Sequence, residues 1–393
     1  MAAERDTPIH LARRMDEIEP FYVMELLGRA RELEAEGRSI IHMEVGEPDF
    51  DTPQPVLDAA QRALSEGKTH YTPALGLAEL RQAVADYYRD HHGVEIPTRR
   101  IIITPGASGA LLLALGVLLN PGDEVLMADP GYPCNRHFVR FVEGRARTVA
   151  VGAESHYQLT SAQLAAEWRD NTVAAMIATP SNPTGTLIPT EELRAMDALT
   201  RERGGRLLVD EIYHGLVYGE NTPSALELSD EIFLINSFSK YFCMTGWRLG
   251  WLVVPESYVT AVEKLAQNLF IAAPTIAQYA ALAAFSPETT AILEERRLEF
   301  QRRRDYLLQA LRELGFEIPL TPEGAFYLYA DCRRFTEDSY GFAQTLLEET
   351  GVAVTPGIDF GSHQANHHLR FAYTTSMEQL QEGVARLRRY LHE

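Results

Sequence analysis

Seven short apolar runs, rich in β-branched residues, alternate with helical patterns between about residues 100 and 255. The runs are IIIT (101–104), EVLMAD (124–129), RTVAV (147–151), AAMIAT (174–179), RLLVD (206–210), IFLINS (232–237) and LGWLVV (249–254). Nearly continuous apolar strands separated by helices are typical of a sheet that is covered on both faces and mostly parallel. The pattern therefore predicts an α/β fold around a mostly parallel, seven-stranded sheet.

Beyond about residue 285 the pattern changes to long amphipathic helices and short strands around GAFYLYA (324–330) and LRFAYT (369–374). A chain of 393 residues is too long for one ordinary hydrophobic core. We therefore expect a large domain over residues 45–285. A smaller α+β domain is expected to combine both chain ends, residues 1–44 and 286–393.

Composition and charge narrow the functional classes. With 46% hydrophobic and 23% charged residues the chain has the balance of a soluble globular protein, and no apolar run is long enough to span a membrane. The net charge of −19 makes nucleic acid an unexpected partner, because phosphate binding needs a basic face. The basic cluster Arg302-Arg303-Arg304 lies in a helical pattern with acids nearby, and we interpret it as a solvated helix face.

Cysteine usage and the N-terminal sequence bear on the compartment. Cys134, Cys243 and Cys332 are odd in number and far apart, which argues against a disulfide framework. The first twenty residues carry charges throughout and lack the apolar segment of a signal peptide. These features predict a cytoplasmic protein.

Polar residues follow several of the predicted strands. PGASG (105–109) comes after the first run, SNPTG (181–185) after the fourth, Asp210 ends the fifth and Lys240 follows the sixth. In sheets of this kind ligands bind at the carboxyl ends of the strands. The sequence therefore predicts a functional site at this edge.

Lys240 stands in the segment SFSKYFCMTGWRLG, close to Ser237, Ser239 and Arg248. An arbitrary lysine is usually solvated. A lysine that forms a Schiff base, however, needs nearby donors that fix the phosphate of its cofactor, and two serines and an arginine can supply them.

The form S-x-S-K followed by G-x-R-x-G resembles the class I/II aminotransferases, which are fold type I enzymes dependent on pyridoxal 5′-phosphate (PLP). The resemblance extends from Val45 to Arg370. Within the family it is nearest to the prokaryotic aspartate aminotransferase branch, through GEPDFDTP, GKTHYTPALG and MTGWRLG. It implies that Lys240 holds PLP as a Schiff base.

The resemblance also implies roles around the cofactor. Asp210 would pair with the pyridine nitrogen, Asn182 and Tyr213 would bond to the phenolic oxygen, and Tyr132 would stack on the ring. Lys240, Asp210 and Tyr213 would form the catalytic set. The expected phosphate contacts are Gly106, Ala107, Ser108, Ser237, Ser239 and Arg248.

Further residues concern the substrate and a partner subunit. By resemblance, Arg370 would bind the α-carboxylate of the substrate through two hydrogen bonds, next to Gly46 and Asn182. Tyr71 would reach the PLP phosphate of a neighbouring subunit, so a homodimer with shared active sites is expected. The histidines in SHQANHH, namely His363, His367 and His368, have no cysteine or acid at ligand spacing, and no metal is expected.

These assignments imply an aminotransferase. It would move an amino group from an L-amino acid to a 2-oxo acid such as 2-oxoglutarate by a ping-pong mechanism, with Lys240 as general base and acid. PLP-dependent carbon–sulfur lyases and related synthases use the same lysine, aspartate and arginine. The sequence does not separate the two classes.

The amino donor stays open as well. The prokaryotic aspartate branch commonly has a lysine in the phosphate turn that meets a side-chain carboxylate, whereas this chain has Ser108 at that position. The segment Pro20–Met24, expected to line the side-chain pocket, is bulky and apolar. A neutral or aromatic donor such as alanine, or a broad range of donors, therefore competes with aspartate.

Overall fold

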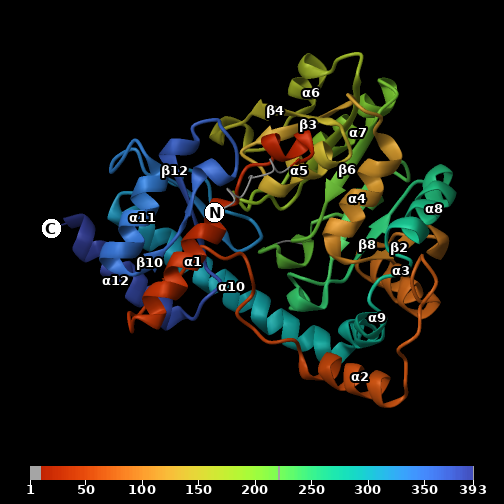
Figure 1. Ribbon diagram of the computed structural model, residues 1–393, viewed down its shortest axis with the longest axis horizontal. Helices are drawn as coiled ribbons and strands as arrows, with labels where there is room; N and C mark the ends of the chain where they lie inside the picture. Colours follow the sequence, from red (N-terminus) through yellow and green to blue (C-terminus); the bar gives the residue numbers. More distant parts are fainter. Residues whose placement is uncertain (1–9, 220–221, 393) are drawn as a thin grey trace, which may run out of the picture.

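The computed structural model describes residues 10–219 and 222–392, and a seven-stranded sheet lies at its centre (Figure 1). The strand order is β2-β8-β7-β6-β5-β3-β4, and only β8 runs against the others. The predicted mostly parallel sheet of seven strands is confirmed. Its strands are β2 (Ile101–Thr104), β3 (Glu124–Asp129), β4 (Arg145–Ala150), β5 (Thr172–Ala178), β6 (Arg206–Asp210), β7 (Phe233–Ser237) and β8 (Gly250–Val253).

Helices cover both faces of this sheet, and alternation along the strands explains why. In β2, Ile101 and Ile103 belong to one buried cluster, while Ile102 between them belongs to another on the opposite face. The first cluster packs under α2 (Gln54–Ser65), α3 (Ala78–His92), α6 (Ser161–Glu167), α7 (Thr190–Glu202) and α9 (Thr275–Ala281). The second packs under α4 (Gly106–Leu118), α5 (Pro133–Phe141) and α8 (Val259–Leu269).

A second, smaller part of the molecule combines the two chain ends. Strand β1 (Ile41–His42) pairs in parallel with β10 (Val352–Ala353), more than three hundred residues later in the chain. An antiparallel sheet has the order β11-β12-β9, from β11 (Thr355–Pro356), β12 (His368–Ala372) and β9 (Tyr327–Asp331). Three helices surround these strands: α1 (Tyr22–Ala35), α11 (Ser339–Thr350) and α12 (Met377–His392).

Helix α10 (Pro287–Leu314) runs from one part of the molecule to the other, as Figure 1 shows. Near its start Leu293 packs in the core of the large sheet, whereas Phe300 and Leu307 pack in the core of the small one. The predicted domain boundary near residue 285 thus lies just before a helix that both cores share, and its position stays a prediction. Within residues 10–219 and 222–392, no helix is both long and apolar enough to cross a membrane.

The interpretation of Arg302-Arg303-Arg304 as a solvated face is wrong for two of the three residues. Arg302 is exposed, but Arg303 is buried and its Nη1 lies 2.7 Å from the carboxylate of Asp49. Arg304 is also buried; it donates to the backbone oxygen of Pro322 at 2.9 Å. Because α10 crosses between the two parts, more than one of its sides is covered by protein.

Candidate active site

A cavity of about 790 Å³ lies at the carboxyl edge of the large sheet and extends to the small sheet. It brings together most residues that the sequence singled out. Those lining it are Gly46, Ala107, Ser108, Tyr132, Asn182, Asp210, Tyr213, Ser239, Lys240, Arg248 and Arg370. Gly106 and Ser237 lie beside these residues in the chain, and Tyr71 lies elsewhere.

Lys240 occupies the turn after β7, and its side chain reaches into the cavity. Its Nζ donates to the backbone oxygen of Gly46 at 2.6 Å and lies 5.9 Å from the ring centre of Tyr213. Burial, reinforced by the positive charge of Arg370, lowers the pKa of Lys240 to about 8. The amine therefore loses its proton far more readily than a surface lysine does.

Gly46 leaves no room for a side chain. A Cβ built on it would lie 1.9 Å from the hydroxyl oxygen of Tyr327. The absence of a side chain lets the backbone pass close to both Tyr327 and Lys240.

Asp210 ends β6, and its carboxylate faces the cavity. One carboxylate oxygen accepts the backbone N–H of Ile212 at 3.0 Å. Burial raises the pKa of Asp210 to about 7, although the Ile212 N–H and the charge of Lys240 oppose the shift. A protonated ring nitrogen placed here would stabilise the ionised carboxylate, so Asp210 fits the pyridine nitrogen of PLP.

The start of α4 forms an anion cradle. No side chain caps this helix, which leaves the N–H groups of its first turn free at the positive end of the helix dipole. Gly106 has a φ of +68°, and a Cβ on it would lie 2.7 Å from Nη2 of Arg248. The Ser237 hydroxyl donates to that of Ser239 at 2.9 Å. Backbone N–H groups, hydroxyls and a guanidinium together fit a phosphate group.

Arg370 is the third residue of β12, inside the strand, and its guanidinium is buried with neutral partners. It donates to the Asn182 side-chain oxygen at 3.0 Å, to the Glu44 backbone oxygen at 2.6 Å and to the Thr355 hydroxyl at 3.2 Å. Its Nε has no partner, and no carboxylate lies within 4.0 Å of it in the described ranges. A buried cation that makes no direct ion pair is costly, and the carboxylate of Asp359 acts on Arg370 only from a longer distance, so the site is suited to bind an anion.

Tyr327 was missed by the sequence reasoning. Its hydroxyl lies 2.8 Å from that of Tyr213, and its ring lies 4.2 Å from the guanidinium of Arg370. It stands in the run GAFYLYA, and alternation puts it on the same face as Tyr329, the cross-strand partner of Arg370. The sequence alone did not show that β9 pairs with β12, and this pairing is what brings Tyr327 next to Arg370.

One wall of the cavity is apolar. The expected residues Phe21, Val23 and Met24 line it, whereas Tyr22 turns away and packs against Tyr340 with ring centres 5.1 Å apart. Further aliphatic and phenylalanine side chains of the lining are Val45, Ala107, Leu111, Phe138, Ala178 and Ile212. Ser108 stands in the first turn of α4, and among the residues that the structure describes the cations of the lining are Lys240, Arg248 and Arg370.

Tyr71 lies outside this cavity. It belongs to the loop between α2 and α3, and 81% of its surface is exposed. The neighbouring His70 backbone oxygen accepts a hydrogen bond from Thr275 at 2.8 Å, which holds the loop against α9.

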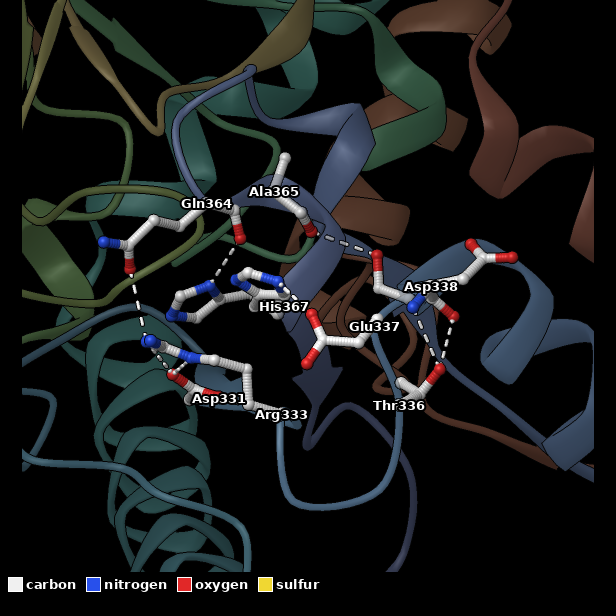
Figure 2. A network of polar contacts seen from close by, with 10 residues as sticks. Asp331, Arg333, Thr336, Glu337, Asp338, Gln364, Ala365 and His367 are labelled. Atoms are coloured by element: carbon white, nitrogen blue, oxygen red, sulfur yellow. Dashed lines mark hydrogen bonds and ion pairs between the residues drawn. The ribbon is translucent and has the colours of Figure 1, made fainter.

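The three histidines of SHQANHH lie between β11 and β12 or at the start of β12, and Figure 2 shows His367 next to Glu337. His367 Nε2 lies 2.8 Å from a carboxylate oxygen of Glu337, and His368 stacks on Tyr329 with ring centres 4.5 Å apart. No cluster of three or more potential metal ligands occurs among the residues that the structure describes.

The fold and the cavity are those of a PLP-dependent enzyme: the start of α4 fits a phosphate group, Asp210 fits a ring nitrogen, and Lys240 is buried in the same cavity. The profile of the family "Aminotransferase class I and II" matches residues 38–387. The chain belongs to this family, whose members are PLP-dependent transaminases.

Several relatives resemble the chain over nearly its whole length. It is 41% identical to the (5-formylfuran-3-yl)methyl phosphate transaminase of Methanocaldococcus jannaschii, covering 98% of this chain and all of that protein. It is 39% identical to the valine–pyruvate aminotransferase of Mycobacterium tuberculosis, with 95% and 97% covered. Among solved structures, an aminotransferase from M. tuberculosis superimposes with a TM-score of 0.95 at 38% identity, covering 98% and 100% of the two chains. The Thermus thermophilus aspartate aminotransferase with maleate gives 0.91 at 35%, covering 97% and 100%.

Proposed function

We propose that this transaminase moves an amino group from a neutral L-amino acid to a 2-oxo acid, with 2-oxoglutarate as an acceptor, by a ping-pong mechanism. The observation that carries the proposal is Arg370, a buried guanidinium that forms no ion pair with any carboxylate of the described residues and lines the same cavity as Lys240. Amino acids and 2-oxo acids share the carboxylate that such a cation would bind, and both must occupy one site in turn.

The cofactor contacts are proposed on the fit of the cavity. The pyridine nitrogen would lie at Asp210, the phenolic oxygen at Asn182 and Tyr213, and the ring against Tyr132. The phosphate would lie among Gly106, Ala107, Ser108, Ser237, Ser239 and Arg248. PLP, when bound, accepts the electrons released when a bond at the substrate Cα breaks.

The residues of this chain supply binding and proton transfer. Arg370 would bind the substrate carboxylate with Asn182 and the backbone at Gly46. The Nζ of Lys240 would take the proton from the substrate Cα and return it during the same half-reaction. Its pKa of about 8 suits an amine that must act as both base and acid near neutral pH.

The apolar wall supports a neutral donor. Phe21, Val23 and Met24 would contact the donor side chain, and Ser108 supplies no charge for a second carboxylate. The relatives differ in what their names say they act on: one uses valine and pyruvate, another a phosphorylated furan aldehyde. The names alone therefore leave the donor open, and the composition of the cavity favours aliphatic or aromatic amino acids.

A homodimer with shared active sites is the proposed assembly. Tyr71 is 81% exposed, and the end of α8 and the segment after it also present Leu269 and Ile271 to solvent, at 53% and 52%. Exposed apolar residues of this size are typical of protein interfaces. Tyr71 would reach the phosphate site of the partner subunit.

A donor screen tests the proposed function. The purified holoenzyme is incubated with single amino acids and with 2-oxoglutarate or pyruvate, and formation of the product amino acid is measured, with Lys240→Ala as control. We expect transfer from aliphatic or aromatic donors at a higher kcat/KM than from aspartate. A preference for aspartate would refute the neutral-donor assignment. Robust pyruvate release from cystathionine, without a 2-oxo acid acceptor, would identify a carbon–sulfur lyase instead.

A further inference from the structure

The N-terminus of α1 forms part of the apolar wall but has no cap of its own. Its N-cap residue, Phe21, makes no side-chain hydrogen bond to the backbone of the first turn. The first N–H groups of a helix need acceptors from elsewhere, because no helical carbonyl precedes them. Phe21, Val23 and Met24 all contact the cavity from this end of the helix.

Asp359 supplies the missing cap from the other end of the chain. One of its carboxylate oxygens accepts the N–H of Tyr22 and the other accepts that of Val23, both at 2.9 Å. Asp359 is 1% exposed and lies in a short 3-10 helix, Gly357–Asp359. A single buried carboxylate thus fixes the end of α1 through two bonds.

The segment that carries Asp359 is itself tied to the rest of the site. The ring of Phe360 lies 4.8 Å from the guanidinium of Arg370, and its backbone oxygen accepts the N–H of Gly131 at 2.8 Å. The carboxylate of Asp129 accepts both the N–H of Ser362, at 3.0 Å, and its hydroxyl, at 2.9 Å. The cap on α1 is therefore held in a fixed place relative to the carboxylate-binding arginine.

We propose that Asp359 is a positioning residue for substrate selectivity. It holds the first turn of α1 so that Phe21 and Met24 meet the side chain of the amino donor. The effect of losing this cap increases with the size of the donor side chain, because alanine has almost no side chain to contact the wall. This inference rests on the proposed function, in which the cavity binds amino acids.

Asp359→Asn is the informative substitution. The amide has nearly the same shape but only one accepting oxygen, and its NH₂ group would face one of the two backbone N–H groups. One of the two hydrogen bonds to the backbone of α1 is therefore lost, and the amide NH₂ group faces a backbone N–H group that is also a donor. Thr160→Ala is the matched control, because the Thr160 side chain accepts the N–H of Gln163 and caps α6 outside the cavity.

The test combines kinetics with hydrogen exchange. Holoenzymes of wild type, Asp359→Asn and Thr160→Ala are assayed with L-phenylalanine, L-leucine and L-alanine as donors. For Asp359→Asn we expect KM for the two large donors to rise about tenfold, with KM for alanine and all kcat values within about twofold. Amide exchange of a peptide spanning residues 20–26 should accelerate in this variant alone. If Asp359→Asn does not fold, Asp359→Ser, which offers one accepting oxygen in place of two, replaces it with the same expected result.

An equal change for all three donors, or the same change in Thr160→Ala, would overturn the inference, because a merely structural cap predicts either result. Unchanged KM values would overturn it as well. If the wild-type protein transferred no amino group, the proposed function would fail. The exchange measurement would then still decide whether Asp359 holds α1.

Discussion

Arg370→Lys is the substitution that probes the proposed carboxylate site most directly. The guanidinium lies in the cavity with an unpartnered Nε and three neutral acceptors: the Asn182 side-chain oxygen, the Glu44 backbone oxygen and the Thr355 hydroxyl. Lysine keeps the positive charge but replaces the planar fork with one ammonium group, so the two-pronged bond to a carboxylate is lost. The substitution therefore tests the contribution of the guanidinium geometry to substrate binding while the positive charge is kept.

The expected loss follows from the energy of one charged hydrogen bond. Such a bond contributes about 1.5–3 kcal/mol, which corresponds to roughly tenfold to 150-fold in kcat/KM. Loss of the bond to Asn182 would add to this value, because the Asn182 oxygen is then left buried without its donor. We therefore expect a decrease near the upper end of the range.

The assay is the first half-reaction, followed by the absorbance change of the cofactor on mixing the holoenzyme with donor. Arg304→Lys is the matched control: Arg304 is also buried, but it bonds to Pro322 and Asp305 outside the cavity. The decrease should vanish for an amine that resembles the donor but lacks the carboxylate. If Arg370→Lys kept kcat/KM within about threefold of wild type, or slowed both compounds equally, the carboxylate assignment would be refuted.

Two further predictions concern Lys240 and Tyr71. In the apoprotein, an amine reagent should modify Lys240 with a pH midpoint near 8, because burial lowers the pKa and only the neutral amine reacts. The modification is quantified by mass spectrometry. A midpoint near 10.5 would contradict the lowered pKa. At pH 7 the neutral fraction would be about 300 times that of an unperturbed lysine. Tyr71→Ala should raise the apparent Kd for PLP several-fold, and mixing it with Lys240→Ala should yield hybrid dimers with one site that carries neither substitution. No recovery of activity in a mixture shown to exchange subunits would exclude a shared site.

The sheet and the catalytic edge could be predicted because both depend on local sequence patterns. Apolar β-branched residues predict a strand at Ile101–Thr104, and the two-residue periodicity of a strand assigns successive side chains to opposite faces of the sheet. Parallel pairing then brings the strand ends together, so Asp210 and Lys240 had to lie near each other. Their placement needs no knowledge of distant contacts.

The parts that escaped prediction depend on pairings between remote segments. Asp359 meets Tyr22 across 337 positions, and nothing near either residue indicates the contact. Tyr327 joins the site only because β9 pairs with β12. Arg303 and Arg304 have the local sequence of a solvated helix face, and they are buried because α10 crosses between the two parts. Hydrophobic periodicity indicates the secondary structure that a segment prefers, whereas the burial of its side chains depends on which other segments pack against it.

The charges in the cavity explain how an acidic protein can bind anionic molecules. At a net charge of −19 the long-range field repels both a phosphate and a carboxylate, so each needs a local cation that water does not screen. Arg248 lies beside the start of α4, and Arg370 lies among neutral acceptors at the small sheet. Each of these cations also lowers the pKa of Lys240. Cations that would hold the anions thus also favour the neutral amine, so binding and proton transfer rest on the same electrostatic arrangement.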